Sequence, residues 1–174
     1  MTTRTVTPQL SLKQEVFSQS GRKMDGVGRY AIWLSRLVLA AATFVFVAIS
    51  VKYIGDPVGA AAAFKISLGS PAAITNMRVG FGAFPLGFAI ITFSSLISTA
   101  RHLRGLFFLM TIIGAATAAR ILGIVVDGPA AESLYVLRPE LAMLTLSIVA
   151  ILLETDRRRA LLTDHFIGQR DART

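Results

Sequence analysis

Four charged side chains lie in or beside otherwise apolar segments, where ionised groups could bind a ligand or move a proton. Arg78, Arg120 and Glu140 each interrupt a hydrophobic stretch, and Asp127 follows Arg120 by seven residues, hence on roughly the same helix face. An isolated charge inside a membrane is costly, so such residues normally face the protein interior and pair with one another or with water. We therefore predict a polar layer of two arginines and one glutamate, with Asp127 at its mouth.

The depth of each charge follows from its distance to the expected helix end. Arg78, Arg120 and Glu140 each lie about two turns from the outer end of their helix, which is roughly 10 Å at about 1.5 Å per residue. They should then share one layer, and Arg120 with Glu140 is the ion pair that we expect. Asn76 and Arg138 lie near the same helix ends and are candidate rim residues.

Two interpretations of this layer stay open. In the functional one, a small polar cavity opens outward and holds a lipid head group or another small anionic ligand against Arg78 and Arg120. Glu140 would then serve as a base or proton carrier. In the structural one, the charges form a clasp that orients three helices during assembly.

Other reactive side chains are poorer candidates for a site. The chain has no cysteine, which excludes disulfides, thiolate metal ligation and cysteine nucleophiles. His102 and His165 lie in basic segments without a spaced ligand partner, so we interpret them as solvated and expect no metal and no cofactor. The run Arg157 to Arg159 is interpreted as an anchor at the membrane surface, with anionic lipid binding as the alternative.

The segments that must position the four charges are long and apolar. Of the 174 residues, 53% are hydrophobic and 16% are charged, and the mean hydropathy is +0.62. This exceeds what one soluble core requires, and about 20 apolar residues suffice to cross a bilayer. We predict an all-α membrane protein, a four-helix transmembrane bundle with spans at about 30–54, 71–100, 105–126 and 132–154.

The regions outside the spans are polar or short. Residues 1–29 are predicted to form a mobile basic tail and residues 155–174 a polar tail, on either side of the transmembrane domain 30–154. The segment 55–70 contains an Ala-rich run too short to cross a bilayer. We interpret it as an interfacial helix or a re-entrant turn.

The second span carries two further signals. Pro85 predicts a kink, because proline interrupts the hydrogen bonding of a helix. Gly80, Ala83 and Gly87 present small side chains on one side, which predicts a close helix contact there.

The basic residues indicate how the bundle lies in its membrane. The net charge is +8, but the basic residues collect at helix ends and do not interleave with aromatic residues, so no nucleic acid partner is expected. Twelve Lys and Arg residues lie in the two tails and in the turn after the second span, against four elsewhere near the opposite helix ends, Lys52, Lys65, Arg78 and Arg138. The positive-inside rule then predicts a cell (inner) membrane protein with both termini cytoplasmic.

Several short motifs, taken in order, resemble one bacterial membrane family. The motifs are Asp56-Pro57, Asn76-Met77-Arg78-Val79-Gly80, Ala119-Arg120-Ile121-Leu122-Gly123, Asp127-Gly128-Pro129 and Glu140. Over about residues 30–154, their order and relative depth are similar to the four-span family of domain of unknown function 4345. The resemblance implies the architecture and draws attention to the four charged residues, but it implies no activity.

We expect a non-enzymatic membrane protein that binds a lipid, a small anionic ligand or a membrane partner through the charged layer. Its partners would be the lipid bilayer and, as a further expectation, a second copy of the chain. One alternative is a small membrane enzyme, an isomerase or transferase on a lipid-soluble substrate, with Glu140 as general base. The other is a proton-coupled transporter, which with four spans per chain would require a homodimer.

Overall fold

The chain folds into a bundle of long helices. The computed structural model describes residues 8–171, and the side chains of residues 28–163. The elements are α1 (Pro8–Gly55), α2 (Pro57–Ala62), α3 (Pro71–Met77), the π-helix η1 (Arg78–Ala83), α4 (Phe84–Ile97), α5 (His102–Asp127) and α6 (Ala131–Asp171). Within this described part, four helical segments are long and apolar enough to cross a membrane: Gly28–Gly55, Pro71–Ile97, His102–Asp127 and Ala131–Thr163. The predicted all-α, four-helix membrane fold is confirmed.

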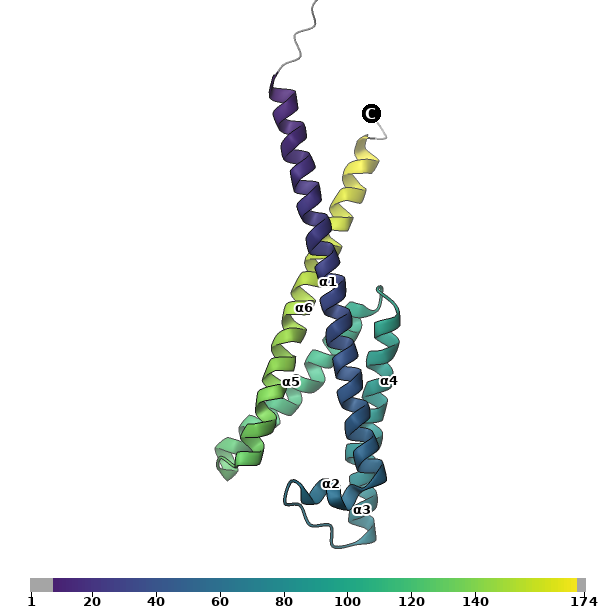
Figure 1. Ribbon diagram of the computed structural model, residues 1–174, viewed down its shortest axis with the longest axis vertical. Coiled ribbons are helices and arrows are strands. Elements are labelled where there is room, and N and C mark those ends of the chain that lie inside the picture. Colours follow the sequence, from purple (N-terminus) through teal and green to yellow (C-terminus); the bar gives the residue numbers. More distant parts are fainter. Residues whose placement is uncertain (1–7, 172–174) are drawn as a thin grey trace, which may run out of the picture.

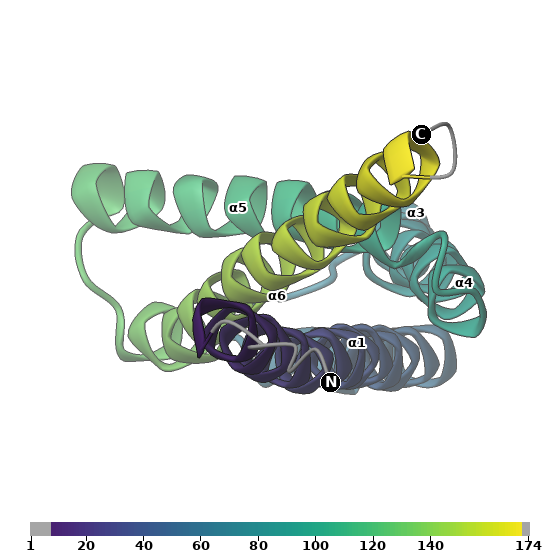
Figure 2. The ribbon, with the colours of Figure 1, turned by 90° about the horizontal axis from the view of Figure 1, so that it is seen from above.

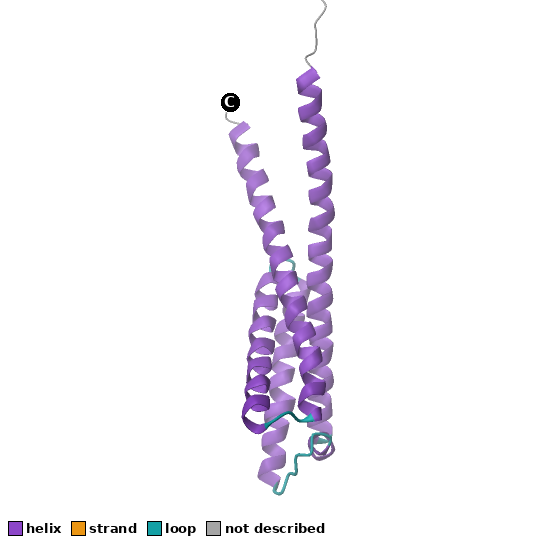
Figure 3. Cartoon of the chain, turned by 90° about the vertical axis from the view of Figure 1, so that its left-hand side faces the viewer, coloured by secondary structure: helices purple, strands orange, loops and turns teal. Residues whose placement is uncertain are grey.

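The first and last helices are longer than their spans. Both α1 and α6 continue beyond the bundle at the same end, where they diverge (Figure 1, Figure 3). Residues 8–29 and 155–171 are therefore helical, which differs from the predicted tails. The apolar span nucleates the helix, which is the unfavourable step, and the helix then extends readily into the adjoining polar residues. The outermost parts of those tails, 1–7 and 172–174, lie outside the described residues.

The second span consists of α3, η1 and α4 in direct succession. Ser70 caps its start, since its hydroxyl accepts a hydrogen bond from the Ala73 amide at 3.2 Å. Pro85 has no N–H, and its ring would clash with a preceding carbonyl in a regular α-helix. The wider π turn lies just before it, and the Phe84 amide there donates to Val79 O, five residues back. The predicted disturbance at Pro85 thus takes the form of a π-helix.

The segment between the first two spans forms α2 and a loop. Asp56 caps α2, because its Oδ1 accepts a hydrogen bond from the Gly59 amide at 2.9 Å. α2 runs crosswise to α1 at the end of the bundle (Figure 1, Figure 3). The Ala-rich run therefore forms a short helix, and its position at the membrane interface stays a prediction.

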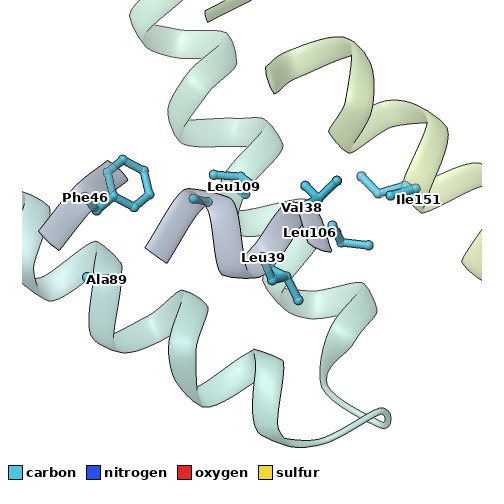
Figure 4. Packing of buried hydrophobic residues seen from close by; sticks show 9 residues of the cluster. Val38, Leu39, Phe46, Ala89, Leu106, Leu109 and Ile151 are labelled. Carbon is cyan, nitrogen blue, oxygen red and sulfur yellow. The ribbon is translucent and has the colours of Figure 1, made fainter. Parts of the chain in front are cut away.

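The core lies where α1 packs against α4, α5 and α6. Its buried cluster, shown in Figure 4, comprises Val38, Leu39, Ala42, Phe46, Ala89, Leu106, Leu109, Ala150 and Ile151. Most of these residues lie toward the end with the α4–α5 turn, from which α1 and α6 also extend. We refer to this end as the terminal end. At the opposite end, the loop end, the α5–α6 hairpin diverges from α1, α3 and α4 (Figure 1, Figure 2).

Two glycines, Gly82 and Gly105, lie where neighbouring helices approach closely. A Cβ on Gly82 would come within 2.7 Å of Ile54 Cγ1, and one on Gly105 would collide with Ser95. The predicted contact at Gly80 and Gly87 is wrong, because a Cβ on either would meet open space. The π turn changes the angle between successive side chains, which displaces faces counted with α-helical periodicity.

Candidate functional site

Arg120 of α5 and Glu140 of α6 form an ion pair inside the second hairpin. Arg120 Nε donates to Glu140 Oε2 at 2.8 Å, and Arg120 Nη2 donates to Glu140 Oε1 at 2.7 Å. The two parallel hydrogen bonds match a planar guanidinium to a planar carboxylate, which is the strongest arrangement of such a pair. The side chains of Arg120 and Glu140 are 29% and 14% exposed, so the pair is reachable from one side.

The hairpin turn brings these two charges together. Residues 128–130 alone separate α5 from α6, and Gly128 has a φ of +93°, a backbone conformation that glycine adopts without strain. The two helices are therefore antiparallel neighbours. Arg120 lies seven residues before the end of α5, roughly 10 Å from that end.

Arg78 does not join this pair. Its Nε donates to Ile54 O at 3.3 Å, so Arg78 binds a carbonyl at the C-terminal end of α1. Counted from the start of its own helix, Arg78 was expected to lie at the same depth as Arg120. Because Arg78 reaches Ile54, next to the last residue of α1, it lies level with the end of the first span. Figures 1 and 2 show α5 and α6 diverging from that side of the bundle.

The remaining predicted site residues are exposed. Among the described side chains, Asp127, Asn76 and Arg138 take part in no side-chain hydrogen bond or ion pair. The Asp127 side chain turns back along its own helix toward Gly123. The structure therefore brings together two of the predicted charges, Arg120 and Glu140, and leaves the other four residues apart from them.

An additional ion pair crosses the loop end. Lys65 Nζ lies 2.5 Å from Glu132 Oε1, which connects the loop after α2 to the first turn of α6. Lys65 has a φ of 59°, an uncommon backbone conformation for a residue other than glycine. The hydrogen bond to Glu132 raises the pKa of Lys65, and the negative charge of Glu132 acts in the same direction. The Lys65 side chain is 79% exposed, so this contact is weak.

The terminal end holds a second cluster, centred on the fully buried carboxylate of Glu154. Arg157 donates to it through Nε at 2.9 Å and Nη2 at 2.7 Å, and Arg158 through Nε at 2.9 Å. Arg158 Nη2 also donates to Thr99 O at 3.0 Å and Ala100 O at 3.1 Å. This cluster fastens α6 to the turn between α4 and α5.

His102 belongs to the same region. It is fully buried, its Nε2 lies 3.3 Å from Leu96 O, and its Nδ1 has no hydrogen-bond partner among the described residues. The interpretation of His102 as solvated is therefore wrong.

The anchor interpretation of the arginine run is also incomplete. Arg157 and Arg158 are bound to Glu154, whereas Arg159 is exposed. The available signal was the spacing of Glu154 three and four residues before two arginines, which places all three on one helix face.

Taken together, these features define a polytopic α-helical membrane protein with an ion pair between two of its spans. Residues 34–151 match the family described as Domain of unknown function (DUF4345), and the chain belongs to this family. The matched region contains Arg120 and Glu140 but ends before Glu154. None of the curated proteins and none of the solved structures matches the chain.

Proposed function

We propose that this protein binds an acidic amphiphile, a lipid-soluble molecule with a carboxylate or phosphate head group, at Arg120 within the membrane. Binding takes place without catalysis. The observation that carries the proposal is the two-bond Arg120–Glu140 pair, a pair of charges held between two spans yet open on one side.

A purely structural clasp accounts poorly for the position of this pair. It joins α5 and α6, which a connection of three residues, 128–130, already holds as antiparallel neighbours. Two charges inside a membrane require desolvation, and a hairpin this short needs no ion pair for its orientation. This argument supports a binding role for the pair.

The surroundings of Arg120 suit an amphiphile. Nη1 of its guanidinium is not bound to Glu140, so an anionic head group can accept hydrogen bonds there or compete with the glutamate. Ala116 and Ile124 lie four residues before and after Arg120 on the same helix face, the first exposed and the second half-buried, and an acyl chain could lie along them. Both oxygens of Glu140 already accept hydrogen bonds from Arg120, which favours binding over proton transfer.

The test is thermal unfolding of the purified protein in a maltoside detergent, with oleate as the acidic probe and oleyl alcohol as its neutral counterpart. Oleate should raise the unfolding midpoint of the wild type, and oleyl alcohol should not. Arg120→Gln should abolish the oleate effect. Glu140→Gln should enlarge it, because the competing carboxylate has been removed.

Arg138→Gln is the matched control, since Arg138 is an exposed arginine two residues from Glu140. It should retain the wild-type response to oleate. An oleate response that survives Arg120→Gln, or an equal response to oleyl alcohol, would contradict the proposal.

Self-association through α5 is a second candidate function. Of the four spans, α5 is the least enclosed by the rest of the chain. In its most apolar 18-residue stretch 11% of the residues are buried, against 33% in that of α1. Ala115, Ala118 and Ala119 on this helix are exposed and small, as at many helix contacts in membranes. Because the chain has no cysteine, Ala115→Cys gives a clean disulfide cross-linking test in membranes. Val47→Cys on α1 is the control, and equal cross-linking of both variants would argue against an interface on α5.

A further inference from the structure

The terminal end carries more positive charge than its acidic residues balance. Every ion pair that the described side chains form at this end involves Glu154, which binds Arg157 and Arg158. Five more arginines with exposed positions lie on this end or in the first turns inward from it: Arg29, Arg36, Arg101, Arg104 and Arg159. Asp156 is the one other acidic residue here among the described side chains. A region of excess positive charge therefore surrounds the α4–α5 turn.

Arg158 is held in place at that turn. Its Nη2 donates to the carbonyls of Thr99 and Ala100, and its Nε donates to Glu154, so the guanidinium has a fixed position. Ala100 directly precedes Arg101 in the chain, which places Arg158 beside Arg101. Nη1 of Arg158 is used in none of these hydrogen bonds and is available to another acceptor.

The start of α5 adds further donors to the same place. Arg101 precedes the first helical residue, and no side chain caps this helix. The amides of Arg101 and His102 donate to Ser98 O and Thr99 O, which leaves the amides of Leu103 and Arg104 as the donors without a backbone partner at the start of this helix. Arg104 lies in this first turn, three residues after Arg101, so the two side chains are neighbours on the helix surface.

We propose that Arg101, Arg104 and Arg158 bind the phosphate group of an anionic phospholipid at the α4–α5 turn. Guanidinium groups bind phosphate with paired hydrogen bonds, and the uncapped start of a helix favours an anion. The turn lies at the end of the apolar stretches of all four spans, which is the level of the lipid head groups. This site is at the opposite end of the bundle from Arg120 and does not depend on the function proposed above.

Native mass spectrometry of the detergent-solubilised protein tests this site with short-chain phosphatidylglycerol, short-chain phosphatidylcholine and sodium phosphate as probes. The wild type should retain phosphatidylglycerol in preference to phosphatidylcholine. The double variant Arg101→Gln/Arg104→Gln should weaken phosphatidylglycerol binding about tenfold, the loss expected for charge-assisted hydrogen bonds. Both residues are exposed, so their replacement should leave the fold intact.

The matched control is Arg29→Gln/Arg159→Gln, which removes the same charge from two other exposed positions at the terminal end. It should change phosphatidylglycerol binding less than twofold, roughly what nonspecific charge alone contributes. Equal losses in both double variants would show diffuse attraction and overturn the proposal, as would equal retention of the two lipids by the wild type. Displacement of phosphatidylglycerol by an equal concentration of sodium phosphate would show a site for free phosphate, which overturns the assignment to lipid.

Discussion

The two ends of the bundle use charged residues in different ways. At the loop end, Arg120 and Glu140 join helices that a short turn already connects, and the pair is partly exposed. At the terminal end, Glu154 is fully buried, and Arg158 extends from it to the α4–α5 turn, almost sixty residues away in the chain.

This difference indicates which cluster stabilises the fold. A buried carboxylate that holds two helices and a distant turn contributes to assembly, and loss of one partner leaves uncompensated charge. A half-open pair within one hairpin contributes less to assembly and is better placed to meet a ligand. The buried hydrophobic cluster follows the same division, since it lies mainly toward the terminal end.

The largest effect is expected from Glu154→Gln. It leaves Arg157 and Arg158 without their carboxylate, and we expect the free energy of unfolding to fall by about 3 kcal/mol. Reversible unfolding in mixed detergent micelles measures this loss. Asp156→Asn removes the same charge from an exposed position two residues away and should be close to neutral. Equal losses for the two variants would show that the burial of Glu154 does not increase its contribution to the free energy of unfolding.

A smaller effect is expected from reversing charge at the loop end. Arg120→Glu places two carboxylates face to face and should lower the free energy of unfolding by about 2 kcal/mol. Adding Glu140→Arg restores opposite charges, and the double variant should recover at least half of that loss. The same unfolding measurement, together with the amount of protein accumulated in membranes, follows both variants. No recovery in the double variant would mean that the hairpin requires the original orientation of the pair.

The smallest effect is expected from the exposed Lys65–Glu132 pair. Lys65→Ala should shift the unfolding midpoint too little to detect at physiological salt, because exposed pairs are screened. The pKa of Lys65 is raised above its ordinary value of 10.5, so any contribution is complete at neutral pH and is lost at more alkaline pH, where Lys65 loses its proton. It is also lost in acid, where the Glu132 carboxylate gains a proton. A loss comparable with that of Glu154→Gln at pH 7 would show that this contact holds the loop end together.

Hydropathy and local chemistry were sufficient to predict much of this protein. The length of each apolar segment against the thickness of a bilayer determined four spans, and Ser70 with Pro71 marked the start of the second. Counting residues from the α5–α6 turn paired Arg120 with Glu140, because a short turn leaves almost no freedom in how two antiparallel helices are aligned.

Tertiary structure alone decided how helices that are distant in sequence are aligned with one another. Arg78 has the expected position in its own helix, yet it meets Ile54, because α3 begins beyond the end of α1. Glu154 and His102 are buried because α6 packs beside the α4–α5 turn, a contact that no local pattern specifies. Periodicity determines which face of a helix is apolar, and the number of residues to the helix end determines how deep a residue lies. The packing of helices side by side determines which residue of another helix it contacts.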